Sequence, residues 1–527
     1  MGGILGRWKP LADSEALVSF LSALALGVAA FAALFPVAQA VPPAVHPHTT
    51  PAPAMFAAGL WLVCGGVVIW LWQGRELGGD EGMEAAKSLQ WLVDSSQWNR
   101  VWNDQPPLMS LMGAVAFKAF SPVMTVARLV VLLVGLCLPV TLAVCCSRMG
   151  ERWASVVAVI LLWLALPWPW ASFMQEGPAY ALALTALLPL LLWGHGRVAL
   201  GVSALVAALA LCVKLTAAFG LVVPFVWLAQ RSWPKALGWG GLTVGGVAVA
   251  SFFLPSWSWS TMVAAHWQSG IPEIQHYRLS PTAYAWNWLV CALALFAIGS
   301  RYLRRSWSPI APWMVAAGAA LGIHLVHRPF FGYYDVHLLT PLAVLGAVGM
   351  VDLYRLILSG RLTRLEQWVA TAAAILACGL WGWQRTEQIY ASYQRSIIVD
   401  TSPVVEGLKT LRERGESAFS KSPKWTFAAG MVVTPPELTI LSLKRGWSGQ
   451  MTYARAAALV ASNHVGGIVV SPQMVVQHSE WSNLLSGYAP TARSDDVVLY
   501  VRKDLNPKPI ELDEHGAVTQ MLRRMGL

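Results

Sequence analysis

The chain has 527 residues, of which 56% are hydrophobic and only 12% are charged, and its mean hydropathy is +0.53. Soluble domains carry about twice that share of charged residues, so the composition excludes a soluble globular protein and indicates an integral membrane protein. The formal net charge is +10, but Lys and Arg lie in short loops between apolar runs, which favours a role in membrane topology over nucleic-acid binding.

The first apolar run, residues 15–40, precedes a Pro-rich linker. Its end, FPVAQA, resembles the end of a signal peptide, but cleavage there would leave the next span pointing the wrong way. We therefore expect an extra helix that spans the membrane or inserts halfway, followed by a linker that ends at residue 54.

Later apolar runs are long enough to predict membrane-spanning helices, since about 18 mostly apolar residues cross the hydrocarbon. They are residues 55–73, 124–146, 153–172, 178–194, 198–213, 216–230, 236–255, 283–300, 309–326, 335–352 and 366–384. The sequence thus predicts an all-α polytopic protein with about 11 or 12 transmembrane helices. All seven cysteines lie in or beside these runs, so neither a disulfide framework nor a metal motif is indicated.

Alternate loops differ in charge. The short loops SRMGER, GHGR, QRSWPK, SRYLRRS and LYRLILSGRLTR carry about eleven Lys or Arg residues, which predicts that they are cytoplasmic. The loop with Asp80, the bend at Glu176, the loop 256–282, the segment HRPFFGYYD and everything after about residue 385 then lie on the opposite side. In a bacterium this is the periplasmic side of the inner membrane.

After residue 397 the pattern changes to that of a small extracytoplasmic α/β domain. VVEGLKTLRERGE and TYARAAALVASNHV have helical patterns, whereas KWTFAAGMVV, GGIVVSP and DDVVLYVRKD have strand-like patterns. We expect three parts: an N-terminal helix and linker (1–54), a transmembrane domain (55–396) with a first outer loop at 74–123, and the α/β domain (397–527).

Acidic residues gather at the ends of spans on the outer side. Asp80, Glu81 and Glu84 open the first outer loop, Asp104 follows, and Glu176 stands alone in the second. Adjacent carboxylates near an apolar boundary hold protons more tightly, as a general base requires. Asp80 could equally cap a helix whose dipole Glu81 and Glu84 complement, and the two roles can coexist.

Outer-side cations are candidates for binding a phosphate. Lys214 interrupts two apolar runs, where it could reach a lipid phosphate or extend to the interface as a structural residue. Arg328 offers a fork-shaped donor on the same face, and Arg278 lies between aromatics in a loop that could contact substrate or rest on the interface. The histidines on this face have no metal spacing, and the sequence has no Walker loop or Gly-x-Ser-x-Gly motif.

The order of motifs resembles the polytopic glycosyltransferases of the C-type fold, above all the protein O-mannosyltransferases and the lipid A aminoarabinose transferases. The resemblance covers roughly residues 55–355. It lies in a span ending in GGDEGMEAAKSL, then WNDQPPLMSLMGAVAFKAF, the acid Glu176, VKLTAAFGLVV and HRPFFGYYDVHLLTPLAVLGAVG.

The resemblance implies transfer of a sugar from a polyprenyl-phosphate donor on the outer face, with inversion at the anomeric centre. Asp80 matches the general base, Glu81 completes the acidic pair, and Glu176 matches an acid of the second outer loop. Several members have aspartate there, which puts a metal site made by Asp80 and Glu176 in doubt, although a divalent metal is possible.

Lys214 and Arg328 match positions where members hold cations near the lipid phosphate, and we add Arg278 to this set. Members usually have a basic or polar residue before Pro-Pro-Leu; here it is Gln105, to which we assign no charge role. Membrane lipids and a lipid, glycan or protein acceptor are the expected partners. Alternative functions are a secondary transporter and a non-catalytic protein of envelope assembly, and the sequence identifies neither the sugar nor the acceptor.

Overall fold

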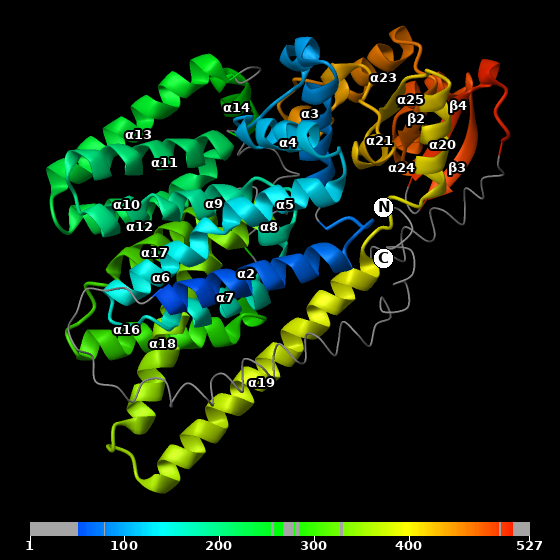
Figure 1. The fold of residues 1–527 in the computed structure, drawn as a ribbon. Coiled ribbons are helices and arrows are strands. Elements are labelled where there is room, and N and C mark those ends of the chain that lie inside the picture. Colours follow the sequence, from blue (N-terminus) through cyan, green and yellow to red (C-terminus); the bar gives the residue numbers. More distant parts are fainter. Residues whose placement is uncertain are drawn as a thin grey trace.

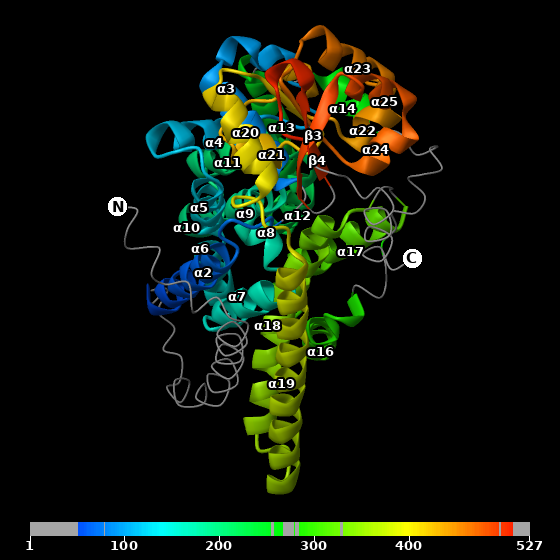
Figure 2. The same ribbon diagram turned by 90° about the vertical axis from the view of Figure 1, so that its right-hand side faces the viewer.

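The structure is a computed structural model, and it describes residues 51–77, 80–254, 258–266, 279, 284–326, 330–494 and 497–509. A helical bundle forms most of the molecule, and a smaller unit of helices and strands lies at one end of it (Figures 1 and 2). The expected helix within residues 15–40 lies outside the described residues.

The bundle consists of helices, and the outer loops between its spans also contain helices. In chain order they are α2 (Pro51–Leu71), α3 (Glu81–Val93), α4 (Leu108–Ala119), α5 (Met124–Gly135), α6 (Cys137–Arg148), α7 (Ala154–Ala165), α8 (Trp168–Ala171), α9 (Glu176–Thr185), α10 (Leu187–Trp193), α11 (Arg197–Val213), α12 (Ala218–Ala229), α13 (Trp233–Phe253), α14 (Trp259–His266), α16 (Trp288–Leu303), α17 (Ala311–Val326), α18 (Asp335–Leu358) and α19 (Arg364–Arg395).

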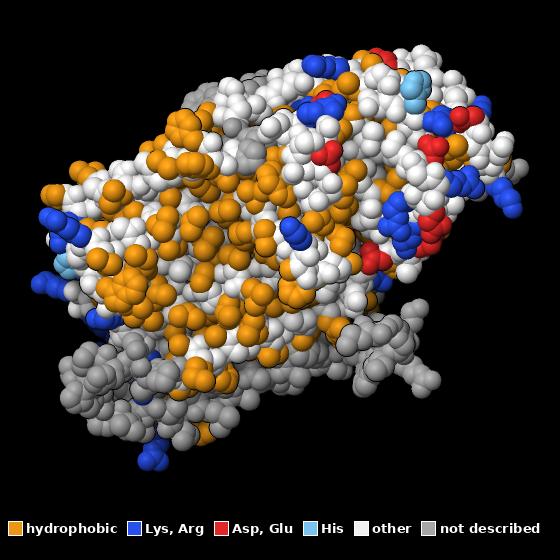
Figure 3. Space-filling view, turned by 45° about the horizontal axis from the view of Figure 1, so that its top comes forward, with side chains coloured by type: hydrophobic (Ala, Val, Ile, Leu, Met, Phe, Trp, Pro, Cys, Tyr) orange, Lys and Arg blue, Asp and Glu red, His pale blue; other side chains and the backbone are white. Residues whose placement is uncertain are grey.

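Each of the eleven predicted spans falls on a helix or on two consecutive helices. Among the described residues, five helical segments are long and apolar enough to cross a membrane, and six further apolar helices have 10 to 17 residues. Apolar side chains cover a broad part of the bundle surface (Figure 3). The chain is a multi-pass membrane protein, as the composition predicted.

Close helix packing holds the bundle together. Helix α7 is buried along its whole length, and Trp61 of α2 meets the edges of Trp163 and Trp170 at ring distances of 5.1 and 5.4 Å. Helices α16 and α18 approach so closely that a Cβ atom on Gly349 would lie 2.0 Å from the carbonyl oxygen of Leu293. Small residues permit such backbone contact between membrane helices.

The five basic loops lie at the same end of the bundle. Arg148 donates to the carbonyl of Leu191, Lys235 to that of His195, and Gln230 to that of Ser308. In Figure 3, Lys and Arg side chains are visible at both ends of the molecule, whereas the visible Asp and Glu side chains lie toward the top and right of the view.

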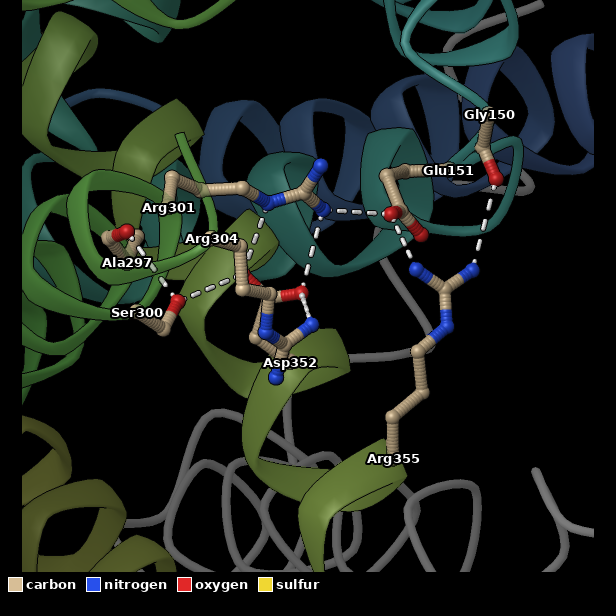
Figure 4. Close-up of polar contacts among 8 residues, drawn as sticks. All are labelled: Gly150, Glu151, Ala297, Ser300, Arg301, Arg304, Asp352 and Arg355. Atoms are coloured by element: carbon tan, nitrogen blue, oxygen red, sulfur yellow. Dashed lines mark hydrogen bonds and ion pairs between the residues drawn. The ribbon is translucent and has the colours of Figure 1, made fainter. Parts of the chain in front are cut away.

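Two buried carboxylates tie three of these loops together (Figure 4). Asp352 accepts hydrogen bonds from Arg301 and Ser300, each at 2.8 Å, and Glu151 accepts from Arg301 at 2.5 Å and from Arg355. Because both acids are at most 2% exposed, the arginines neutralise charge that the bundle could not otherwise bury.

The unit after α19 is a small α/β unit. Its elements are α20 (Pro403–Glu413), β1 (Ala418–Ser420), α21 (Lys424–Ala428), α22 (Leu443–Trp447), α23 (Tyr453–Ser462), β2 (Gly467–Val470), α24 (Pro472–Gln477), α25 (Ser479–Leu485), β3 (Tyr488–Ser494) and β4 (Val497–Arg502). The sheet has the strand order β1-β2-β4-β3; β1 and β2 are parallel, and the other pairs are antiparallel.

One local prediction for this unit was wrong. The stretch KWTFAAGMVV was expected to be a strand, but Lys424–Ala428 forms the helix α21, and only Val433 makes a bridge to β1. A short apolar run does not distinguish a buried strand from a buried helical turn, and Trp425 and Phe427 are both buried here.

The α/β unit packs directly on the first outer loop. A Cβ atom on Gly82 of α3 would lie 2.9 Å from the Cα atom of Lys424, so the backbones of α3 and α21 are in contact. Lys424 also pairs with Glu76 at 2.6 Å, and Arg100 pairs with Glu437 at 2.6 Å. These contacts close the space between the bundle and the unit on one side.

Candidate active site between the bundle and the α/β unit

A cavity of about 470 Å³ lies between the outer-loop end of the bundle and the α/β unit. The bundle and its outer loops contribute five separate segments to its lining, around residues 80–87, 102–105, 174–176, 214 and 331–333, and the unit contributes five more, around residues 421–422, 440–444, 453, 471 and 497. The polar residues that line it are Asp80, Glu84, Lys87, Asp104, Gln105, Gln175, Glu176, Lys214, Tyr333, Lys421, Ser422, Ser442, Lys444, Tyr453 and Ser471. Residues more than 300 positions apart in the chain therefore share one site.

Asp80 lies just before the first turn of α3. Its carbonyl oxygen accepts hydrogen bonds from the amides of Met83 and Glu84 at 3.1 and 3.3 Å, but its side chain makes no cap hydrogen bond. Among the described residues, no side chain lies within ion-pair distance of its carboxylate. The capping role, which the sequence left open, is thus not the role of this side chain in the structure.

Glu81 points away from this cavity into the bundle. Its two carboxylate oxygens accept hydrogen bonds from Nε and Nη2 of Arg128, each at 2.7 Å. They also accept hydrogen bonds from the backbone amides of Phe173 and Leu77. Glu81 and Arg128 are each 1% exposed. Since this bidentate pair and the two amides occupy both oxygens, Glu81 holds the start of α3 in place and is not available to a substrate.

Six charged residues of the cavity form three ion pairs. Lys87 pairs with Glu84 at 2.7 Å, and Ser110 donates to the other oxygen of Glu84 at 2.8 Å. Lys444 of the α/β unit pairs with Asp104 at 3.3 Å. The third pair joins Lys214 and Glu176 and is described next.

Lys214 follows the last residue of α11, and its ammonium group lies against the carboxylate of Glu176, the first residue of α9. The same ammonium lies 5.1 Å from the ring centre of Tyr333 and 5.8 Å from that of Tyr334. Lys214 is 5% exposed, so its charge faces the cavity and the aromatic rings, and the side chain does not extend to open water.

The surroundings of Asp80 raise the pKa of its carboxyl group above the ordinary value. Burial is the largest cause, and the nearby carboxylates of Glu176 and Asp104 act in the same direction. The ammonium groups of Lys214 and Lys444 lower the pKa and so oppose this effect. Asp80 therefore accepts a proton more readily than an exposed aspartate.

The structure brings only some of the predicted site residues together. Asp80, Glu176 and Lys214 lie in one cavity, whereas Glu81 lies outside it. Arg278 and Arg328 are outside the described residues, and so is most of the loop 256–282.

Sequence reasoning missed Lys421 and Lys444, because nothing in a loop of a separate unit indicates which residue of the bundle it will face. It also missed the ion pair of Lys214 with Glu176. The histidines His324 and His337 hydrogen-bond to each other at 3.0 Å within stacked aromatic rings.

The carboxylates of the cavity do not fit a divalent metal held by Asp80 and Glu176. In the part of the chain that the structure describes, no three His, Cys, Asp or Glu side chains are grouped to hold an ion. Lys214 already places a positive charge on Glu176, so a metal would have to displace the ammonium.

Comparison with known proteins identifies the fold. No family model and no curated protein matches the sequence. The crystal structure of ArnT from Cupriavidus metallidurans in the apo state is similar, with a TM-score of 0.56 and 16% sequence identity over 86% of this chain and 98% of the ArnT chain. ArnT is a lipid A aminoarabinose transferase. The likeness confirms the predicted fold class: the chain has the C-type glycosyltransferase fold, with a small α/β unit at its C-terminal end.

Proposed function

We propose that the protein is a glycosyltransferase that moves a sugar from a polyprenyl-phosphate carrier to an envelope lipid, glycan or protein, with inversion, on the outer face of the membrane. The observation that carries this proposal is the Asp80 carboxylate, which faces a cavity with no ion-pair partner among the described residues while three neighbouring acids are paired. An unpaired carboxylate with a raised pKa suits a general base.

In the reaction, a hydroxyl group of the acceptor attacks the anomeric carbon, and its proton passes to a carboxylate oxygen of Asp80. The new bond joins the acceptor oxygen to this carbon. The bond from the carbon to the phosphate oxygen breaks on the opposite side, and its electron pair leaves with the lipid phosphate. Attack and departure on opposite faces invert the anomeric centre.

Lys214 stabilises the leaving group. An ammonium group has three donor hydrogens, so Lys214 can bind a phosphate oxygen while it keeps its contact with Glu176. Fixed positive charge at the position where negative charge develops lowers the barrier. Arg328 and Arg278 are proposed to add further contacts to the phosphate.

Two further observations support this proposal: the fold that the chain shares with ArnT, and the position of the cavity at Glu176, where a long apolar helical segment begins. A secondary transporter would place its ionisable groups near the midplane of the membrane. Glu176 and Lys214 lie instead at the first residue of α9 and just past the end of α11.

The test uses purified protein and a labelled polyprenyl-phosphate sugar, with membrane extract as the source of acceptor. Asp80→Asn should lower transfer by about a hundredfold or more, the size of effect that a positioned general base provides. Asp94→Asn makes the same chemical change outside the cavity, at a side chain that accepts hydrogen bonds from the backbone amide and the hydroxyl of Ser96, and should leave transfer unchanged. Full activity of Asp80→Asn would refute the proposed role of Asp80.

A further inference from the structure

One lysine of the cavity has no acidic partner among the residues that the structure describes. Four carboxylates and four lysines from the described residues line the cavity, and three of each form the ion pairs given above. In the described chain this leaves Lys421 without a carboxylate within ion-pair distance, and its Nζ lies over the ring of Tyr453, 5.4 Å from the ring centre. The α/β unit thus presents an uncompensated positive charge to the cavity.

The position of Lys421 in the sheet is a second, independent observation. Lys421 and Ser422 follow β1 directly, Ser471 follows β2 directly, and the amide of Lys421 donates to the carbonyl of Val469 at 3.1 Å. Since β1 and β2 are parallel, these residues all lie at the carboxyl ends of the two strands. Open α/β sheets bind their ligands at this edge.

The chemical groups at this edge match an oxyanion. Lys421 supplies the charge, and the hydroxyl groups of Ser422 and Ser471 can donate hydrogen bonds; the Ser471 oxygen also accepts from the amide of Met474 at 3.3 Å, which leaves its hydrogen free to donate. Contact with the face of Tyr453 restrains the lysine side chain.

We propose that Lys421, Ser422 and Ser471 bind an anionic group, a phosphate or a carboxylate, that the acceptor carries at a distance from its attacking hydroxyl. The proposal rests on the proposed function and adds to it the chemical class of the acceptor. The α/β unit then selects acceptors by charge, while the bundle performs the transfer.

The lipid phosphate of the donor is the other possible source of an oxyanion. It arrives with its chain in the membrane, and Lys214 meets it at the end of a bundle helix. Lys421 instead belongs to the unit that follows α19 and lies at the carboxyl end of β1, in the wall that the unit contributes to the cavity. We therefore assign the Lys421 site to the acceptor.

The test measures binding to the purified full-length protein without turnover. Two probes are titrated separately: inorganic phosphate, followed by phosphorus NMR, and polyprenyl phosphate without a sugar. Lys421→Met should weaken the binding of inorganic phosphate at least tenfold, Lys421→Arg should largely restore it, and neither should change the affinity for polyprenyl phosphate. Lys503→Met is the matched control, because this lysine of the same unit binds the carbonyl of Ser486 outside the cavity and should behave as the parent protein does.

Two results would overturn the inference. Phosphate binding that survives Lys421→Met excludes the site, and an equal loss of affinity for polyprenyl phosphate assigns the site to the donor. Melting temperatures of the variants identify any loss of folding, and Lys421→Arg tests the site if Lys421→Met does not fold. Repeating the titration on Asp80→Asn keeps this result separate from the proposed function, since phosphate binding does not require transfer.

Discussion

Two adjacent acids, Asp80 and Glu81, have different surroundings because a helix begins between them. Successive residues of a helix point about 100° apart, so Asp80 faces the cavity while Glu81 enters the bundle and binds Arg128. The sequence predicted an acidic pair at this position. It could not show which member faces the substrate, because that depends on Arg128, 47 residues away.

The raised pKa of Asp80 predicts the acid side of the pH profile. A general base acts as a carboxylate, so transfer should fall as the pH drops through the pKa of Asp80, and this fall should occur at higher pH than the ordinary aspartate value of about 3.9. Lys444 lowers that pKa, and Lys444→Gln should therefore move the fall to still higher pH. Initial rates from pH 4 to pH 9 check this, and a shift to lower pH would contradict it.

At the scale of elements, the pair of Glu81 and Arg128 joins the end of α2, the start of α3 and the helix α5. Arg128 also donates to the carbonyls of Trp72 and Arg75 at 2.8 and 2.7 Å, and Glu81 receives the amide of Phe173 at 3.0 Å. These contacts fix the backbone that carries Asp80. The family resemblance identified Glu81, but only the packing shows that it positions Asp80.

Removing one charge of this pair should reduce stability. Glu81→Gln leaves Arg128 with an uncompensated buried charge, which typically costs about 3–5 kcal/mol.

Asp80→Asn should not reduce stability. Burial raises the pKa of Asp80 in the folded state, so the ionised carboxylate destabilises the fold above that pKa. Removing this charge should therefore not lower the melting temperature at neutral pH. Thermal unfolding of both variants in detergent measures their melting temperatures. An equal fall in melting temperature for Glu81→Gln and Asp80→Asn would contradict the prediction.

At the scale of the whole molecule, the basic loops and the cavity lie at opposite ends of the bundle. Hydropathy and loop charge predicted the spans and grouped the basic loops, because both patterns depend only on the local sequence. Asp80, Glu176 and Lys214 were predicted as site residues, but the part of the lining that the α/β unit contributes could not be predicted, since residues after α19 fold back over a loop near residue 80. The helix α21, which was predicted as a strand, also lies in this interface, with its backbone against Gly82 of α3.

The direction of insertion can be tested with cysteine labelling. The described native cysteines are buried or half-buried, so the parent protein should react slowly. We expect Ser96→Cys, at an exposed position of the first outer loop, to react in intact cells with a thiol reagent that cannot cross the membrane. Ser359→Cys, at the basic end, should react only after the cells are opened. The reverse pattern would place the cavity in the cytosol and rule out transfer on the outer face.

The cavity wall formed by Lys421, Lys444 and Ser471 has a consequence for biosynthesis. These residues leave the ribosome after every helix of the bundle has been made, so a nascent or prematurely terminated chain has the Asp80 carboxylate but lacks this wall of the cavity. The complete lining therefore exists only after the α/β unit has been made, and incomplete chains left in the membrane would lack the site that we propose for the acceptor.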